Sequence, residues 1–155
     1  MMYNVPVSSP NRRLFDITTT VRDWETNTVT ESGACGDKII DICVRYVGSD
    51  NETGMATMEV KMVSGYVPHE QSLNELQREF GHFIGLKRFD KYKPGEPLSL
   101  YFDKFDNVLR CIPIKLKQEM FVKDTKDAVI KVYDYYKPAV VGLKSYNTCE
   151  AEDQN

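Results

Sequence analysis

The chain has 155 residues, of which 41% are hydrophobic and 28% are charged. This length suffices for one domain with a substantial core, and the composition excludes wholesale disorder. The formal net charge of −3 provides no basic field, so nucleic acid is not an expected partner. No apolar run approaches the ~20 residues of a membrane span, and the first residues lack the apolar stretch of a signal peptide. From the doubled methionine and abrupt start we expect a fragment of a longer protein, although a cytosolic full-length chain would begin in the same way.

Residues 1–13 contain two prolines and two serines and are expected to form a linker from a preceding domain. Beyond them, apolar and polar residues alternate in short segments that are separated by turn signals. Such alternation indicates antiparallel strands with one buried and one solvated face. We therefore expect a mainly β domain over residues 14–149, an antiparallel β-sandwich of about eight strands, followed by a frayed tail over 150–155. The predicted strands lie at about 15–21, 40–46, 58–63, 83–89, 98–102, 108–120, 128–136 and 139–146.

The alternation also predicts which side chains face the core. Ile40, Ile42 and Val44 share one face of their strand, while Cys43 lies on the other. Cys111 lies on the polar face of the segment 108–120. Pro113 in the same segment lacks a backbone N–H, so this strand should lie at a sheet edge or carry a bulge.

The period of the apolar residues changes within 57–80. Strand-like alternation ends near Ser64-Gly65, and Leu73, Leu76 and Phe80 then recur with helical spacing. We predict one short helix at about residues 69–79, with a narrow apolar stripe facing the sheets. Its polar side is the candidate surface for a protein partner and consists of Glu70, Gln71, Asn74, Gln77 and Arg78.

The four cysteines do not show the C-x-x-C spacing of a zinc or redox site. Cys43 and Cys111 both point outward from predicted strands, which suits a cross-strand disulfide. Cys35 precedes the second strand and Cys149 follows the last one, so a second bond could join the ends. The sequence alone leaves three connectivities open. Two such bonds would place the protein outside the cell, whereas free thiols in the cytosol are the alternative.

The triplet Asn51-Glu52-Thr53 is an N-glycosylation sequon within a predicted turn. In a secreted protein this placement favours a glycan on Asn51.

Patterns for catalysis and for metal binding are missing. His69 and His82 lie at ligand spacing neither from each other nor from a cysteine. No nucleophile elbow or phosphate-binding glycine loop occurs. Asp103 and Asp106 do not have the spacing of a calcium loop. We expect neither an enzyme nor a bound cofactor or metal.

Four stretches in the same order resemble the C-terminal domain of the alpha-2-macroglobulin and complement-like thioester proteins. They are VKMVSGYVP (60–68), LYFDKF (100–105), AVIKVYDYY (128–136) and the closing Tyr146-Asn147-Thr148-Cys149. That domain is called the receptor-binding or eighth macroglobulin domain, and the resemblance covers about residues 14–149. It implies a β-sandwich with one helix, in a secreted parent that traps proteases or tags foreign surfaces. The family's thioester sequence is absent here and would lie upstream in the parent.

In the vertebrate macroglobulins, two lysines one helical turn apart dock into scavenger receptors of the low-density-lipoprotein type. The matching positions are Glu70 and Asn74. An acidic receptor pocket would repel Glu70, so the resemblance does not extend to this receptor. The extra Cys43 and Cys111 point to an invertebrate-type member of innate immunity.

Two further interpretations compete with a recognition module. The domain could instead pack against the thioester domain of its parent and keep it inactive, which charge reversal at Glu70 and Arg78 would reveal as premature thioester hydrolysis. Alternatively, it could be a cell-surface adhesion sandwich unrelated to thioester chemistry. The expected partners are therefore a protein or cell-surface receptor and other domains of the parent.

Overall fold

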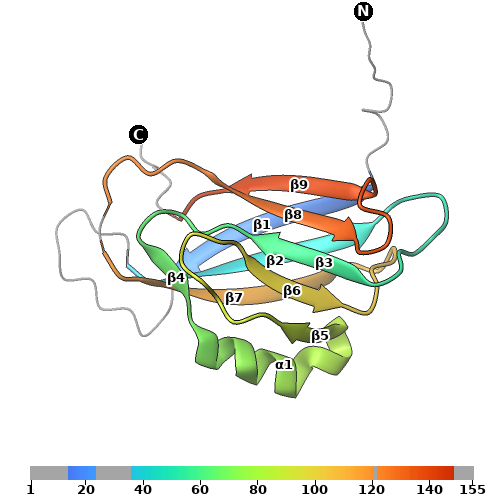
Figure 1. The fold of residues 1–155 in the computed structure, drawn as a ribbon, viewed down its shortest axis with the longest axis horizontal. Helices are drawn as coiled ribbons and strands as arrows, with labels where there is room; N and C mark the ends of the chain where they lie inside the picture. The colour runs from blue at the N-terminus through green and yellow to red at the C-terminus, as the bar shows by residue number, and fades with distance from the viewer. Residues whose placement is uncertain (1–13, 24–35, 121, 149–155) are drawn as a thin grey trace, which may run out of the picture.

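A computed structural model describes residues 14–23, 36–120 and 122–148. Within these ranges the chain forms nine strands and one helix (Figure 1). In chain order they are β1 (Phe15–Asp23), β2 (Lys38–Tyr46), β3 (Ala56–Val60), β4 (Tyr66–Pro68), α1 (Glu70–Ile84), β5 (Leu86–Phe89), β6 (Leu98–Phe102), β7 (Arg110–Gln118), β8 (Ala128–Asp134) and β9 (Val141–Tyr146).

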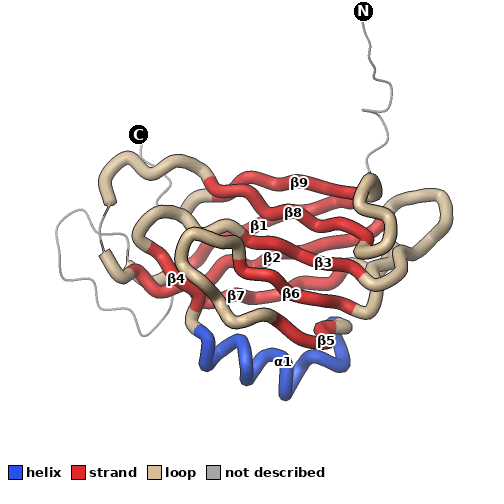
Figure 2. The backbone as a smooth tube through the Cα atoms, viewed as in Figure 1, coloured by secondary structure: helices blue, strands red, loops and turns tan. Residues whose placement is uncertain are grey.

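The strands form two antiparallel sheets, which confirms the predicted β-sandwich. One sheet has the order β1-β2-β7-β4 and the other the order β5-β6-β3-β8-β9. Figure 2 shows the strands as two layers with the helix alone below them. The strand that was not expected is β4, because its three residues are too few to show an alternating pattern.

The core lies between the sheets and is built from the inward faces that the alternation predicted. Ile40, Ile42 and Val44 of β2 are fully buried. The facing sheet contributes residues such as Met58 of β3 and Leu100 of β6, which are also fully buried. Apolar burial of this kind contributes about 1.5–3 kcal/mol per large side chain and dominates the stability of the fold.

Pro113 is accommodated without a bulge, because β7 pairs with β2 in unbroken register. Cys43 and Cys111 face each other with Cα atoms only 3.9 Å apart, which is the close spacing of a pair that exchanges no backbone hydrogen bonds. Pro113 and Asp41 lie two residues along and form the same kind of pair. The proline nitrogen therefore points away from β2 and toward the side of β7 where β4 lies. Because β4 pairs only with residues 116–118, it does not extend as far as Pro113. The expectation of an edge strand was wrong for β7 as a whole, but locally Pro113 occupies an edge.

Helix α1 closes the side of the sandwich between β5 and β7, opposite the side where β1 and β9 approach each other (Figure 1). The predicted range of 69–79 was too short, because the helix continues to Ile84. Residues 83 and 84 are therefore helical, and the strand expected from residue 83 begins only at Leu86.

Candidate partner-binding surface

Helix α1 is fixed at both ends by local interactions. At its start, the Nδ1 atom of His69 accepts a hydrogen bond from the Ser72 backbone N–H at 3.3 Å, which satisfies one of the free donors of the first turn. At its end, Gly85 adopts the left-handed conformation, with φ 76°, and its N–H donates to the Gly81 carbonyl. A Cβ on Gly85 would also lie 2.4 Å from a carboxylate oxygen of Asp103, so any other residue there would be strained and would displace that side chain.

Two of the five predicted surface residues are held by contacts within the domain. The Glu70 carboxylate accepts a hydrogen bond from the Tyr92 backbone N–H at 3.0 Å. The Gln77 amide donates to the Lys87 carbonyl at 3.2 Å. Both side chains are half-buried, and each links α1 to the chain segment that forms or follows β5.

The other three predicted residues are exposed on the helix. Gln71, Asn74 and Arg78 succeed one another at spacings of three and four residues, so they lie on one face. Together with Glu75 and Gln77 they line a shallow, open hollow. Gln71 makes a long contact of 3.5 Å to Glu75, which fixes neither side chain firmly. This face can offer hydrogen bonds and one guanidinium group to another molecule.

The predicted apolar stripe was wrong at its last member. Leu73 and Leu76 are buried as expected, whereas Phe80 is 51% exposed. Phe83, which the sequence assigned to a strand, is 77% exposed on the same helix. The C-terminal half of α1 therefore has exposed apolar side chains, whereas those of its first half are buried against the sheets.

The outward-pointing cysteines of β2 and β7 are joined. Cys43 and Cys111 are paired in register and form a disulfide across 68 residues of sequence. The second suggested pair, Cys35 and Cys149, lies outside the described residues. The sequon residue Asn51 lies in an exposed turn with φ 74°, a left-handed conformation that asparagine tolerates better than most residues.

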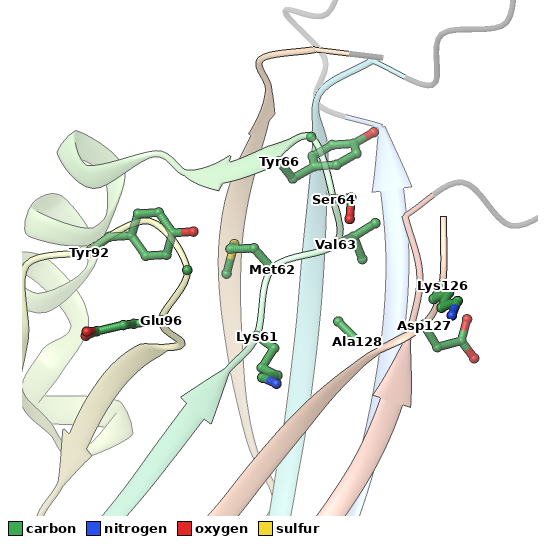
Figure 3. Close-up of a pocket in the computed structure, with 12 residues that line it drawn as sticks. Lys61, Met62, Val63, Ser64, Tyr66, Tyr92, Glu96, Lys126, Asp127 and Ala128 are labelled. Carbon is green, nitrogen blue, oxygen red and sulfur yellow. The ribbon is translucent and has the colours of Figure 1, made fainter. Parts of the chain in front are cut away.

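A cavity of about 430 Å³ opens at the end of the sandwich where α1 begins. Figure 3 shows Tyr92 and Glu96 on one side of it and Lys126 and Asp127 on the other. Burial raises the pKa of Tyr92, as does the more distant charge of Glu119, while a hydrogen bond from the Gly95 backbone opposes them. The raised pKa keeps the Tyr92 phenol protonated at neutral pH, so Tyr92 is not an activated nucleophile.

The described ranges contain no cluster of three or more side chains able to hold a metal ion. The same ranges contain no helix with the length and apolar character needed to cross a membrane. Among the described residues, the exposed polar face of α1 is the candidate surface for a protein partner.

Residues 51–147 match the protein family described as the A-macroglobulin receptor binding domain. The chain belongs to the A-macroglobulin receptor-binding family. The match covers β3 to β9 and includes all of α1. An A-macroglobulin receptor-binding domain is a non-catalytic binding module, and a protein receptor is its class of partner. The first strands, β1 and β2, lie outside the matched range but belong to the same sandwich.

Proposed function

We propose that this A-macroglobulin receptor-binding domain spans residues 14–149 of a secreted thioester-containing protein and recognises a protein partner through the polar face of α1. Gln71, Asn74 and Arg78 would make the direct contacts, and Glu70 and Gln77 would hold the helix in place. The observation that carries this proposal is the exposure of these three side chains on a helix fixed at both ends. A rigid helix limits the entropy lost on binding.

The composition of this face indicates the kind of partner. Arg78 is flanked by Glu75 and Glu79, and the nearest Arg78–Glu79 distance is 4.0 Å between exposed groups. Such an exposed pair contributes little to stability, so Arg78 is available to a carboxylate on another molecule. A receptor surface of mixed charge with hydrogen-bonding groups suits this face better than a strongly acidic pocket, which Glu75 and Glu79 would repel.

An extracellular location is supported by the Cys43–Cys111 disulfide, because such bonds persist in oxidising compartments. The exposed Asn51 is then a site for an N-linked glycan. A loss of mass after treatment with an N-glycosidase, absent in Asn51→Gln, would test the glycan.

The experiment compares full-length parent protein carrying Arg78→Glu with a matched reversal, Lys117→Glu, on the outer face of β7. Two quantities are measured: binding of the parent to phagocytic cells and the rate of thioester hydrolysis. We expect Arg78→Glu to reduce cell binding at least tenfold, with hydrolysis unchanged and with Lys117→Glu behaving as wild type. Faster hydrolysis with intact cell binding would instead assign the helix face to packing against the thioester domain.

A further inference from the structure

The five-stranded sheet opens at the end of β3. Strands β3 and β6 pair as far as Val60 and Leu98. Pro97, just before β6, has no backbone N–H that could continue the ladder. The N–H of Glu96 donates to the Lys93 carbonyl at 3.0 Å, within its own turn. The chain that leads into β6 therefore does not pair with the residues that follow β3.

The residues that follow β3 are instead held from the other side, by Tyr146 of β9. The Tyr146 hydroxyl donates a hydrogen bond to the Lys61 carbonyl, and the backbone N–H of Val63 hydrogen-bonds the same phenol oxygen. The N–H of Lys61 also donates to the Val129 carbonyl of β8 at 3.1 Å. These bonds fix the main chain on both sides of Met62.

The two bonds to Tyr146 determine where the main chain of Met62 points. In a trans peptide, the C=O of one residue and the N–H of the next point in opposite directions. The Met62 N–H points away from Tyr146, because the Lys61 carbonyl points toward it. The Met62 carbonyl also points away from Tyr146, because the Val63 N–H points toward it. Neither group of Met62 has a hydrogen-bond partner among the described residues.

The cavity of about 430 Å³ lies on this free side of Met62. Tyr146 belongs to β9, which is separated from β3 by β8. The opposite side of β3 is that of β6, where Tyr92 and Glu96 line the cavity. Figure 3 shows the Met62 side chain pointing toward this same wall. The volume lies within the range of about 300–1,000 Å³ that is typical of ligand sites.

We propose that this cavity binds an extended segment of another polypeptide, which pairs with Met62 as an added strand. In an antiparallel ladder, a residue exchanges one N–H and one C=O bond with the residue opposite, and Met62 presents this pair. Main-chain bonds give such an added strand its affinity. Two lysines and two carboxylate residues line the cavity, so the preferred segment carries no strong net charge. The proposal does not depend on the function proposed for the polar face of α1.

An NMR titration of the ¹⁵N-labelled 155-residue chain with the peptide acetyl-Thr-Val-Ser-Val-Thr-amide tests the proposal. The peptide is uncharged, and its β-branched residues favour an extended conformation. We expect saturable shifts centred on the Met62 amide, with a dissociation constant on the order of 1 mM. The same peptide with a methyl group on every backbone nitrogen keeps its side chains but loses its donors. It should bind at least tenfold more weakly.

Variants of the chain separate the main-chain bonds from the side chain. Met62→Pro removes the N–H of the pair and should weaken peptide binding at least tenfold, with thermal unfolding used to verify its fold. Met62→Leu retains the main-chain groups, is the matched control and should bind as wild type. Arg78→Glu should also bind as wild type, because the polar face of α1 is not part of this cavity. Weaker peptide binding by Arg78→Glu would place the peptide on the helix and overturn the proposal.

Hydrogen exchange of the free chain tests the premise without any variant. The Met62 amide should exchange much faster than the Lys61 amide, which is bonded to β8, and the peptide should slow it. Slow exchange of Met62 in the free chain overturns the proposal, because the amide would then already have a partner. An absence of saturable shifts, shifts centred on another strand edge such as β1, or equal binding of the methylated peptide also overturns it.

Discussion

The Glu70 carboxylate, on the first residue of α1, accepts a hydrogen bond from the backbone N–H of Tyr92 at 3.0 Å, 22 residues away in sequence. This bond ties the start of the helix to the loop that connects β5 and β6. The negative charge also lies at the positive end of the helix dipole, which favours the helix. Glu70 therefore holds the helix that carries the candidate surface, although the sequence placed it among the contact residues.

Replacing Glu70 with alanine leaves the Tyr92 N–H without its partner and removes the favourable dipole interaction. We expect the free energy of unfolding to fall by about 1–2 kcal/mol. Urea denaturation of the purified chain measures this change. Glu79→Ala is the control, since Glu79 is exposed in the same helix and near its other end. Equal stability of the two variants would show that the bond contributes nothing.

Features that depend on neighbouring residues were predicted correctly from the sequence. Features that depend on residues far away along the chain were not. The alternation around Ile40, Ile42 and Val44 is local and gave the correct inward face. The exposure of Phe80 could not be predicted, because helical spacing defines a face but not where the sheets beneath it end. The short strand β4 depends on the partner residues 116–118, about 50 positions along the chain.

The candidate surface shows the same limit. Gln71, Asn74 and Arg78 are exposed as the helical period implied. The engagement of Glu70 by Tyr92 is a long-range contact with no local signal. Val108 and Leu109 were assigned to the strand expected at 108–120, whereas they lie exposed just before β7.

The Cys43–Cys111 disulfide closes a loop of 68 residues between two strands that are already paired. In the chain-entropy view, a cross-link of this span restricts the unfolded chain by up to about 4 kcal/mol. The double variant Cys43→Ala/Cys111→Ala should fold to the same sandwich and lose about 2–4 kcal/mol. Guanidinium unfolding measures this loss, and a change below about 0.5 kcal/mol would contradict it.

Cys35 and Cys149 are expected to form the second disulfide. Gly36 follows Cys35 in the sequence, Thr148 precedes Cys149, and both contact the Tyr66 side chain. The Tyr66 hydroxyl donates a hydrogen bond to the Gly36 carbonyl at 2.7 Å. Thr148 hydrogen-bonds the same phenol. Mass spectrometry of a non-reduced digest should yield a peptide that links Cys35 to Cys149. Detection of both as free thiols would refute the pairing.

The Tyr46 hydroxyl donates a hydrogen bond to Asp50 at 2.5 Å. Burial of the ring, followed by this bond and the nearby carboxylates, raises the pKa of Tyr46 from 10.0 to about 12. Because the folded-state pKa is the higher one, Tyr46 stabilises the fold fully below pH 10.0, and this contribution is lost as the pH rises through about 12.

The free energy of unfolding should therefore decline across this alkaline range, and Tyr46→Phe should make the decline shallower. Denaturant unfolding at a series of pH values measures the slope. Tyr136→Phe, which alters an exposed ring, is the matched control. An unchanged slope in Tyr46→Phe would show that the phenol does not couple to folding.

The central claim is that the exposed polar face of α1 carries recognition. Its most direct test is the dissociation constant of the labelled 155-residue chain for phagocytic cells, measured for wild type, Asn74→Arg, Arg78→Glu and the control Lys117→Glu. We expect saturable binding that Asn74→Arg and Arg78→Glu weaken at least tenfold and that Lys117→Glu leaves unchanged. Saturable binding with the same dissociation constant for all four chains would contradict it.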